Sequence, residues 1–493
     1  MDGRMAMRGG GELLLEVERR RGAVVRSLQA SLRGAIRDGR LRAGESLPAT
    51  RQLATELGIS RASVVEAYGR LAAEGFVTSQ PGSATRVASD AGAPTPAHAP
   101  AVSEATFDLR PGGPDVSLFP WDAWARAAAR VARTAPLGVL QYGDPSGQPS
   151  LRAALTAYLA RTRAVATRPD DLVVTAGVTQ SLALICRALQ RRGDTVLAVE
   201  DPGPNTSERA LIRRTGLEPL PIPVDHEGID VAALESSGAA AVLVTPAHQY
   251  PTGTVLSAPR RRALVGWARA AGRGEAARLI IEDDYDAEFR YDRQAVASLQ
   301  GLAPDRVAYL GSASKLLAPG LRLGWAAPPT WLAREVALEK AYDDFGSPTI
   351  DQLIFAELIE DGTLARHVRR ARMAYRRRRD VTLAAIATHL PSWRVRGVAA
   401  GLQVYLEPPR PIRERQIVRR AWRHGLWLAG IGGFHDREAP IPAGRPTGLV
   451  IGFAMVPESA IEESIATLAA IIAGEHPPSA MVRGLGHRRA ARP

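Results

Sequence analysis

The sequence predicts an α/β protein with a small helical unit followed by a larger unit built on a mostly parallel sheet. Three observations support this expectation. The apolar runs DLVVTAG, DTVLAVE, AAVLVTP, ARLIIED and RVAYLGS alternate with amphipathic stretches between residues 107 and 474. Residues 13–88 have helical periodicity, and residues 89–106 are rich in Ala and Pro without periodicity. Alternating buried strands and helices favour a parallel sheet covered on both faces, with a small α+β part at the C-terminal end. Residues 89–106 are expected to be an extended linker.

The bulk composition is that of an ordinary globular protein. At 493 residues the chain is too long for one compact domain, and 45% hydrophobic and 23% charged residues argue against a disordered chain. We find no apolar run of the roughly 18 residues that a bilayer span needs, and no signal peptide. We therefore expect no membrane contact, a cytoplasmic location and a disordered basic tail over residues 475–493. The single cysteine, Cys186, excludes an internal disulfide and is expected to be buried.

The basic residues carry two kinds of information. A net charge of +12 makes nucleic acid a candidate partner. Of the 63 basic side chains only two are lysines, Lys315 and Lys340. Arginine cannot form a Schiff base with a carbonyl, so each retained lysine is a candidate for a position where a primary amine is needed. Lys315 is the stronger candidate because of its sequence surroundings.

Residues 47–87 predict two short helices joined by a tight turn, followed by two strands. Gly58 ends the first helix and Ser60 caps the second, which is the arrangement of a helix-turn-helix. Apolar residues mark the inner faces: Leu53, Ala54 and Leu57 in the first helix, and Val64, Ala67, Tyr68 and Leu71 in the second. The segment FVTSQPGSATRV predicts two short strands around a Pro-Gly turn, which together form a wing. The start of the second helix is then expected to enter the major groove of DNA.

This N-terminal unit resembles the GntR family of winged-helix regulators, from LP-x-x-R through the second helix to the wing glycine. The resemblance implies that Arg51 and Arg61 contact DNA and that Ser60 and Ser63 assist them. It also implies that Gly82 lets the wing approach the DNA backbone. The alternative is an ordinary three-helix module whose arginines lie on a solvated face.

The segment GSASKLLAPGLRLGW carries the residue types of a pyridoxal-phosphate site. Lys315 follows a predicted strand end, Ser312 and Ser314 precede it, and Arg322 stands seven positions later. An amine at this position can form an imine with the cofactor aldehyde, while hydroxyls and a guanidinium hold the phosphate. In IEDDYDAEF a carboxylate can keep the pyridine nitrogen protonated, and a phenol can bond the ring oxygen. VTAGVTQSL predicts a glycine turn before a helix, whose N–H groups favour a phosphate.

Taken together in this order, these motifs resemble the fold type I aminotransferases. More specifically, they resemble the MocR-type regulators, in which such a domain is fused to a GntR-type DNA-binding domain. The matching stretches are YGDPSGQPSLRAAL, VTAGVTQSL, TPAHQYPTG, IEDDYDAEF, SASKLLAPGLRLGW and GLVIGF. The resemblance implies a Schiff base on Lys315, a contact of Asp283 with the pyridine nitrogen and a contact of Tyr285 with the ring hydroxyl.

The remaining cofactor contacts implied by the resemblance concern the phosphate. They come from Ser312, Ser314, Arg322 and the turn at Gly177, Val178 and Thr179. Tyr142 matches a tyrosine that reaches the phosphate in the neighbouring subunit, which implies a homodimer. The alternatives are a buried ion pair between Asp283 and Arg322 and a solvated surface lysine at position 315.

Four departures from the aminotransferase pattern bear on function. Tyr250 stands where the enzymes have an asparagine near the ring oxygen; it remains a cofactor-contact candidate. Pro204 and Asn205 replace an aromatic residue that stacks on the ring, and Gln403 stands where relatives often have histidine. TGLVIGFAMV lacks the arginine that clamps a substrate carboxylate, and Arg445 comes too early in the chain. Little or no turnover of ordinary amino acids is therefore expected.

Three functional hypotheses follow from these motifs. The first is a pyridoxal-phosphate-dependent regulator of operator DNA, with the cofactor itself or a small amine as effector. Effector binding would change the placement of two winged helices in a dimer. The second is a working aminotransferase with a fused DNA-binding module. The third is an inactive scaffold that serves only dimerisation.

Overall fold

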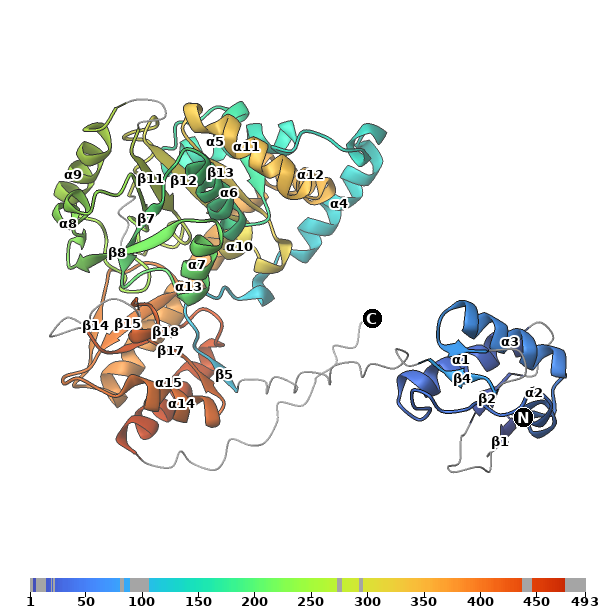
Figure 1. Ribbon diagram of the computed structural model, residues 1–493. Coiled ribbons are helices and arrows are strands. Elements are labelled where there is room, and N and C mark those ends of the chain that lie inside the picture. The colour runs from blue at the N-terminus through green and yellow to red at the C-terminus, as the bar shows by residue number, and fades with distance from the viewer. Residues whose placement is uncertain are drawn as a thin grey trace. The chain divides into compact units, whose positions relative to one another are not determined.

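The chain folds into two compact units, Met1–Ser103 and Glu104–Pro493 (Figure 1). The computed structural model describes residues 3–5, 15–18, 20, 23–79, 84–88, 106–272, 277–291, 296–436 and 446–474. Gly82, the expected tail and nearly all of the expected linker therefore lie outside the described residues. The domain limits expected from the sequence, 13–88 and 107–474, remain predictions.

The small unit is a helix-turn-helix with the strand pair that the sequence predicts for the wing and a second strand pair that the sequence analysis does not anticipate. Its elements are α1 (Val24–Arg37), α2 (Thr50–Leu57), α3 (Arg61–Ala73), β1 (Gly3–Met5), β2 (Leu15–Val17), β3 (Val77–Thr78) and β4 (Arg86–Val87). β1 pairs antiparallel with β2, and β3 pairs antiparallel with β4. The apolar faces of the three helices form one buried core, which includes the inner-face residues expected from the sequence.

The turn between α2 and α3 is fixed by local interactions. Gly58 has the left-handed φ of 61° that ends α2, a conformation that glycine adopts at little cost. The Ser60 hydroxyl accepts a hydrogen bond from the Ser63 N–H at 3.1 Å and so caps α3. The Tyr68 hydroxyl donates to the Pro48 carbonyl at 3.0 Å and ties α3 to the segment before α2.

The large unit is built on an eight-stranded sheet of order β6-β13-β12-β11-β10-β7-β8-β9. The strands are β6 (Val173–Thr175), β7 (Val196–Asp201), β8 (Glu218–Asp225), β9 (Gly228–Ile229), β10 (Ala241–Val244), β11 (Leu279–Asp283), β12 (Val307–Ser312) and β13 (Gly324–Ala327). All five predicted strand runs are present. β13 runs antiparallel to both its neighbours, because the connection after β12 is too short for a parallel crossover.

Helices cover both faces of this sheet (Figure 1). One face packs on α6 (Val178–Arg191) and α11 (Thr330–Asp344), and buried Cys186 lies here. The other face packs on α5 (Pro149–Arg163), α8 (Val231–Ser236), α9 (Ala258–Arg269) and α12 (Thr349–Glu360). Neighbouring strand residues alternate between the two faces, as the period of a β-strand requires. α4 (Trp121–Thr134) packs on α12, and α7 (Thr206–Arg214) contributes to the first face.

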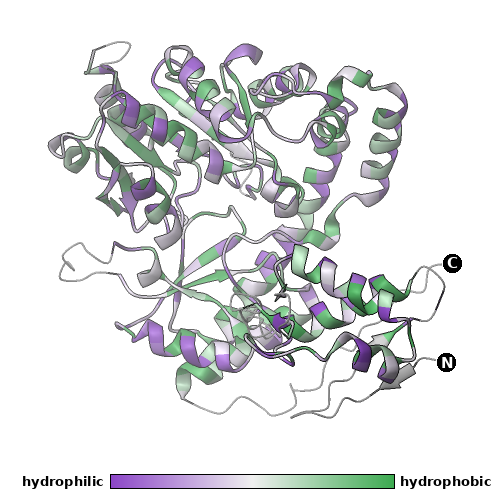
Figure 2. Ribbon diagram, turned by 45° about the vertical axis from the view of Figure 1, so that its right-hand side comes forward, coloured by the Kyte–Doolittle hydropathy of each residue, from purple (hydrophilic) through white to green (hydrophobic). Residues whose placement is uncertain are grey.

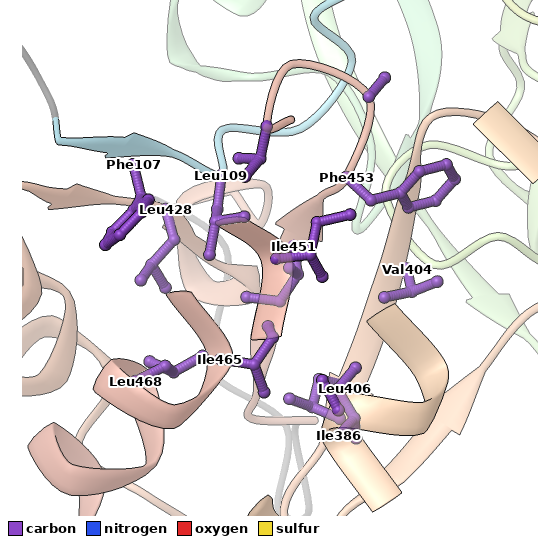
Figure 3. Close-up of a cluster of buried hydrophobic side chains, with 14 of the residues drawn as sticks. Phe107, Leu109, Ile386, Val404, Leu406, Leu428, Ile451, Phe453, Ile465 and Leu468 are labelled. Atoms are coloured by element: carbon purple, nitrogen blue, oxygen red, sulfur yellow. The ribbon is translucent and has the colours of Figure 1, made fainter. Parts of the chain in front are cut away.

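A smaller α+β part forms the C-terminal end of the large unit. Its elements are α13 (Thr363–His389), β14 (Arg394–Arg396), β15 (Gln403–Glu407), α14 (Glu414–Arg423), β16 (Leu426–Trp427), β17 (Ala429–Gly430), β18 (Leu449–Gly452) and α15 (Glu458–Ala473). β14, β15, β18 and β17 form an antiparallel sheet, and β5 (Phe107–Asp108) pairs with β16. Side chains from these elements meet in one apolar core (Figure 3).

The helices of both units carry hydrophilic and hydrophobic residues side by side (Figure 2). This is expected of amphipathic helices that bury one face and expose the other. Within the described part of the chain, no helix is both long enough and apolar enough to cross a membrane.

A buried ion pair fixes α5 against the end of β11. Arg163 Nε donates to Asp284 Oδ2 at 2.6 Å, and Arg163 Nη2 donates to Asp284 Oδ1 at 3.1 Å. The two side chains are only 4% and 1% exposed. The Tyr309 hydroxyl donates to the same carboxylate at 2.8 Å. Buried charges need such partners, so each member of this group depends on the others.

Removing the Asp284 carboxylate is expected to destabilise the large unit strongly. Asp284→Ala leaves the Arg163 charge buried without its partner and should cost about 3–5 kcal/mol of unfolding free energy. Asp225→Ala is the matched control, since Asp225 pairs with Arg260 at 2.7 Å but is 43% exposed; it should cost under about 1 kcal/mol. Urea unfolding followed by tryptophan fluorescence reports on the large unit, which contains all 8 tryptophans. Equal midpoints for the two variants would contradict this account.

Candidate functional site

A cavity of about 320 Å³ opens where several strands of the main sheet end. Ligands of open α/β sheets commonly bind at the carboxyl ends of strands. Its walls come from the ends of β7, β10, β11 and β12 and from the starts of α6 and α7. Nine of the predicted cofactor residues line it: Val178, Thr179, Tyr250, Asp283, Tyr285, Ser312, Ser314, Lys315 and Arg322.

Lys315 lies in α10 (Ala313–Leu316), the short helix that directly follows β12. The Ser312 hydroxyl caps this helix by accepting a hydrogen bond from the Ser314 N–H at 3.3 Å. Burial lowers the pKa of the Lys315 amine, although Asp286, Asp283 and Glu208 act in the opposite direction. A lowered pKa increases the fraction of neutral amine, which is the nucleophilic form.

Asp283 ends β11 and presents an unsatisfied carboxylate oxygen. Within the described part of the chain, the buried atom Oδ1 has no hydrogen-bond partner. Burial and, after it, the nearby acids Glu208, Asp284 and Asp286 raise the pKa of Asp283 well above its ordinary value. Such a carboxyl group is suited to share a proton with a ring nitrogen. The orphaned oxygen therefore fits the pyridine nitrogen of pyridoxal phosphate.

An anion-binding corner lies at the start of α6. Gly177 precedes this helix with a φ of 116°, and its N-terminal N–H groups favour an anion. A Cβ at Gly177 would lie 3.2 Å from Arg322 Nη2, so the guanidinium lies against this turn. Arg322 itself has a left-handed φ of 50°. Together with the lining hydroxyls of Ser312 and Thr179, this corner has the chemistry of a phosphate site.

Tyr285 and Tyr250 also line the cavity. The Tyr285 hydroxyl accepts a hydrogen bond from Gln403 Nε2 at 2.8 Å and lies 3.0 Å from His248 Nδ1. Burial raises the pKa of both phenols, so both stay protonated at neutral pH. The Tyr250 ring makes edge contacts with Tyr285 and Phe434 at centroid distances of 5.5 and 5.2 Å.

Tyr142 lies on the surface, outside this cavity. It is 93% exposed, and its ring contacts that of Phe345 at a centroid distance of 6.1 Å. The sequence assigns this residue to the phosphate of a neighbouring subunit, and that assignment stays a prediction.

Of the predicted DNA-contacting residues, Ser60, Arg61 and Ser63 lie at the start of α3, and Arg51 lies in the first turn of α2. Arg51, Ser60 and Arg61 are exposed, and Ser63 is half-buried. The Ser60 and Ser63 hydroxyls lie 2.8 Å apart. Arg61 Nε reaches Thr50 Oγ1 only at 3.5 Å, which leaves the guanidinium available to a ligand. The DNA-contact assignments themselves stay predictions.

Two family descriptions match the two units. "Bacterial regulatory proteins, gntR family" matches residues 24–87, and "Aminotransferase class I and II" matches residues 112–435. The chain is 33% identical to the pyridoxine biosynthesis transcriptional regulator PdxR of Corynebacterium glutamicum, over 86% of this chain and 91% of PdxR. It is 30% identical to the probable rhizopine catabolism regulatory protein MocR of Rhizobium meliloti, over 90% and 92% of the two chains.

The chain belongs to the MocR-type transcription regulators. A solved structure agrees with the fold of the larger unit in this MocR-type chain. LysN, the α-aminoadipate aminotransferase of Thermus thermophilus, was solved in complex with N-(5'-phosphopyridoxyl)-L-leucine. It matches with a TM-score of 0.65 at 26% identity, over 75% of this chain and 92% of LysN.

Sequence reasoning missed two acids that line the cavity of this MocR-type regulator. Glu200 ends β7 and accepts hydrogen bonds from Thr245 Oγ1 at 2.6 Å and from Gln249 Nε2 at 3.3 Å. Burial raises the pKa of Glu200 to about 7. Glu208 lies in the first turn of α7, where the pattern N-T-S-E indicates a helix cap and carries no sign of a cavity position.

β18 belongs to the segment in which aminotransferases carry the arginine that binds the substrate carboxylate. All four residues of this strand, Leu449–Gly452, are buried, and none is an arginine. Among the described residues, Lys315 and Arg322 are the cations that line the cavity. Arg445 lies outside the described residues.

Adding a methyl group at Gly177 is expected to weaken the phosphate corner. In Gly177→Ala the new Cβ meets the Arg322 guanidinium and the φ of 116° becomes strained. We expect the affinity for pyridoxal phosphate, measured by absorbance titration, to fall at least about tenfold. Gly193→Ala is the control, because Gly193 has a φ of 96° with open space around it. An unchanged affinity in Gly177→Ala would contradict the assignment.

Removing the Arg61 side chain is expected to weaken DNA binding by about 1–3 kcal/mol if it contacts a base. The DNA is a fragment that the wild-type protein selects from a random-sequence pool, and affinity is measured by fluorescence anisotropy at fixed salt. Arg33→Ala is the control, since Arg33 forms an ion pair with Glu74 at 2.7 Å within the unit. If both variants bind like wild type, the recognition-helix assignment is wrong.

Proposed function

We propose that this MocR-type regulator binds pyridoxal phosphate in the cavity and that the occupied cavity changes its affinity for operator DNA. The observation that carries the proposal is the convergence of Lys315, the orphaned Asp283 oxygen and Arg322 on one cavity. An amine, a carboxyl group that pairs with the ring nitrogen and an anion corner are the three groups that this cofactor needs. The effector is the cofactor itself or a small amine that joins it.

Each cavity residue has a distinct task in this proposal. When bound, pyridoxal phosphate supplies an aldehyde for a primary amine and a ring that withdraws electrons. Lys315 offers a buried amine of lowered pKa, and Asp283 holds a proton toward the ring nitrogen. Arg322 and the start of α6 bind the phosphate. Tyr285, positioned by Gln403 and His248, donates toward the ring oxygen.

The names of similar proteins support this cofactor. LysN carries a phosphopyridoxyl compound in its solved structure, and PdxR is named for pyridoxine biosynthesis. Neither name identifies the genes that this chain controls.

A homodimer is the assembly we propose. Among the described residues of the large unit, six large apolar side chains are more than two-thirds exposed: Trp121, Leu137, Leu140, Tyr142, Tyr342 and Phe345. Exposed apolar groups of this kind mark interaction surfaces when they cluster. A dimer that covers them would bring Tyr142 toward the phosphate of the partner subunit. It would also present two winged helices to operator DNA. We propose a cytoplasmic location because that is where such a regulator meets its operator.

An active aminotransferase is the second candidate, and the complete Lys315–Asp283–Arg322 set favours it. Binding of an amino acid would still require a cation for its carboxylate. Such a charge-assisted pair contributes about 1.5–3 kcal/mol to binding. No lining cation among the described residues is left for that task once the cofactor is held. Steady-state turnover with a panel of amino acids measures this activity directly, and little or none is expected.

Reductive trapping is expected to label Lys315 and leave Lys340 unlabelled. The cofactor-saturated protein is reduced with borohydride, digested and analysed by mass spectrometry. Lys340 is an internal control because it is fully buried and paired with Asp344 at 2.6 Å. Lys315→Ala should fold normally and show no imine absorbance band. If Lys315 stays unlabelled in a saturated sample, the cofactor proposal is wrong. The large unit would then serve only dimerisation, and the small unit would remain a DNA-binding domain.

A further inference from the structure

One carboxylate of the cavity, that of Glu208, has no task in holding the cofactor. Glu208 lies in the first turn of α7, and a capping box fixes it there. Its Oε2 accepts a hydrogen bond from the Asn205 N–H at 2.8 Å, and its own N–H donates to Asn205 Oδ1 at 3.2 Å. Both residues line the cavity. The cap therefore holds a carboxylate in the cavity wall.

The second oxygen of this carboxylate has no cation bound to it. Among the described residues, Glu208 Oε1 takes part in no hydrogen bond or ion pair. The neighbouring Arg209 is already paired with Asp201 and Asp436, each at 3.2 Å. Burial raises the pKa of Glu208, and the Asn205 N–H, Lys315 and Arg209 oppose this rise. The carboxylate is thus partly desolvated and depends on positive charge in the cavity.

The charges of the cavity walls do not balance once the cofactor is assigned its contacts. Among the described residues, three acidic side chains (Glu200, Glu208 and Asp283) and two basic ones (Lys315 and Arg322) line the cavity. Glu200 accepts hydrogen bonds from Thr245 and Gln249 at Oε2, and burial raises its pKa to about 7, so at neutral pH it needs less counter-charge than a fully ionised acid. In the proposed complex, Asp283 pairs with the ring nitrogen and Arg322 pairs with the phosphate. The amine of Lys315 is bound to the aldehyde carbon. Glu208 is left without a counter-charge.

We infer that the effector of this cavity is a small amine carrying a second cationic group, and that Glu208 binds this second group. The inference rests on the proposed function, because it assumes the cofactor in place. An α-amino acid would instead bring its carboxylate toward Glu208, and Arg322, the arginine that lines the cavity among the described residues, is already assigned to the phosphate. A diamine has the required charge at both ends.

The apolar walls of the cavity suit the chain between two such groups. Leu182, Leu211, Leu243 and Pro204 line the same space as Glu208 and Lys315. Methylene groups that pack against these side chains leave water, which favours binding in proportion to the buried apolar area. The effector class is therefore a short aliphatic diamine.

The test compares amines of one length on the full-length, cofactor-saturated protein. The probes are 1,4-diaminobutane, 1-aminobutane and L-2-aminobutyrate, and binding is followed by the change in cofactor absorbance. Wild-type protein should bind the diamine about 10- to 100-fold more tightly than the monoamine, and the amino acid most weakly. Equal affinity for diamine and monoamine would overturn the inference.

Two variants assign the preference to Glu208. Glu208→Gln can keep the capping box, because a glutamine oxygen also accepts the Asn205 N–H, and it should reduce the preference to about twofold or less. Glu208→Arg should shift the preference toward L-2-aminobutyrate. Glu235→Gln, on the exposed face of α8, is the control and should behave like wild type. A diamine preference that persists in Glu208→Gln would contradict the inference.

The outcomes separate this inference from the proposed function. If Lys315 is trapped by reduction but the wild-type protein shows no diamine preference, only the inference fails. If Lys315 is not trapped at all, the proposed function fails with it. Should either variant misfold, as judged by circular dichroism, the wild-type series alone decides.

Discussion

The buried ion pair between Arg163 and Asp284 is the constraint on which the site depends. Successive residues of a strand point to opposite sides, so fixing Asp284 toward Arg163 directs Asp283 into the cavity. Glu282 agrees with this alternation, since it accepts hydrogen bonds from the Leu299 and Gln300 N–H groups at 3.0 Å each. Of these three consecutive acids, Glu282 and Asp284 have hydrogen-bond partners within the protein, and the Oδ1 atom of Asp283 has none among the described residues.

Local sequence was sufficient to predict which residues lie at strand ends near the cavity, while their roles toward a cofactor stay predictions. Lys315, Asp283 and Gly177 each directly follow or end an apolar run, and parallel strands bring such ends to one edge of the sheet. The helix-turn-helix could also be predicted from neighbouring residues alone, because Gly58 and Ser60 define its turn.

Other features depend on packing between distant segments, and the sequence did not reveal them. Glu208 enters the cavity because α7 packs beside the sheet, and its motif indicates only a helix cap. Glu200 finds its donors on a loop about 45 residues away. The antiparallel β13 between β12 and β6 also follows from the sheet order, which apolar runs do not specify. Tyr142 depends on a partner subunit and stays a prediction.

In the proposed function, occupation of the cavity by the cofactor changes the affinity of this regulator for operator DNA. The most direct measurement is the operator affinity of full-length protein, by fluorescence anisotropy, with and without saturating pyridoxal phosphate. The account predicts affinities that differ at least about fivefold for wild type and do not differ for Lys315→Ala. Equal operator affinities, and equal protected regions on the DNA, for wild-type protein with and without pyridoxal phosphate would contradict the account.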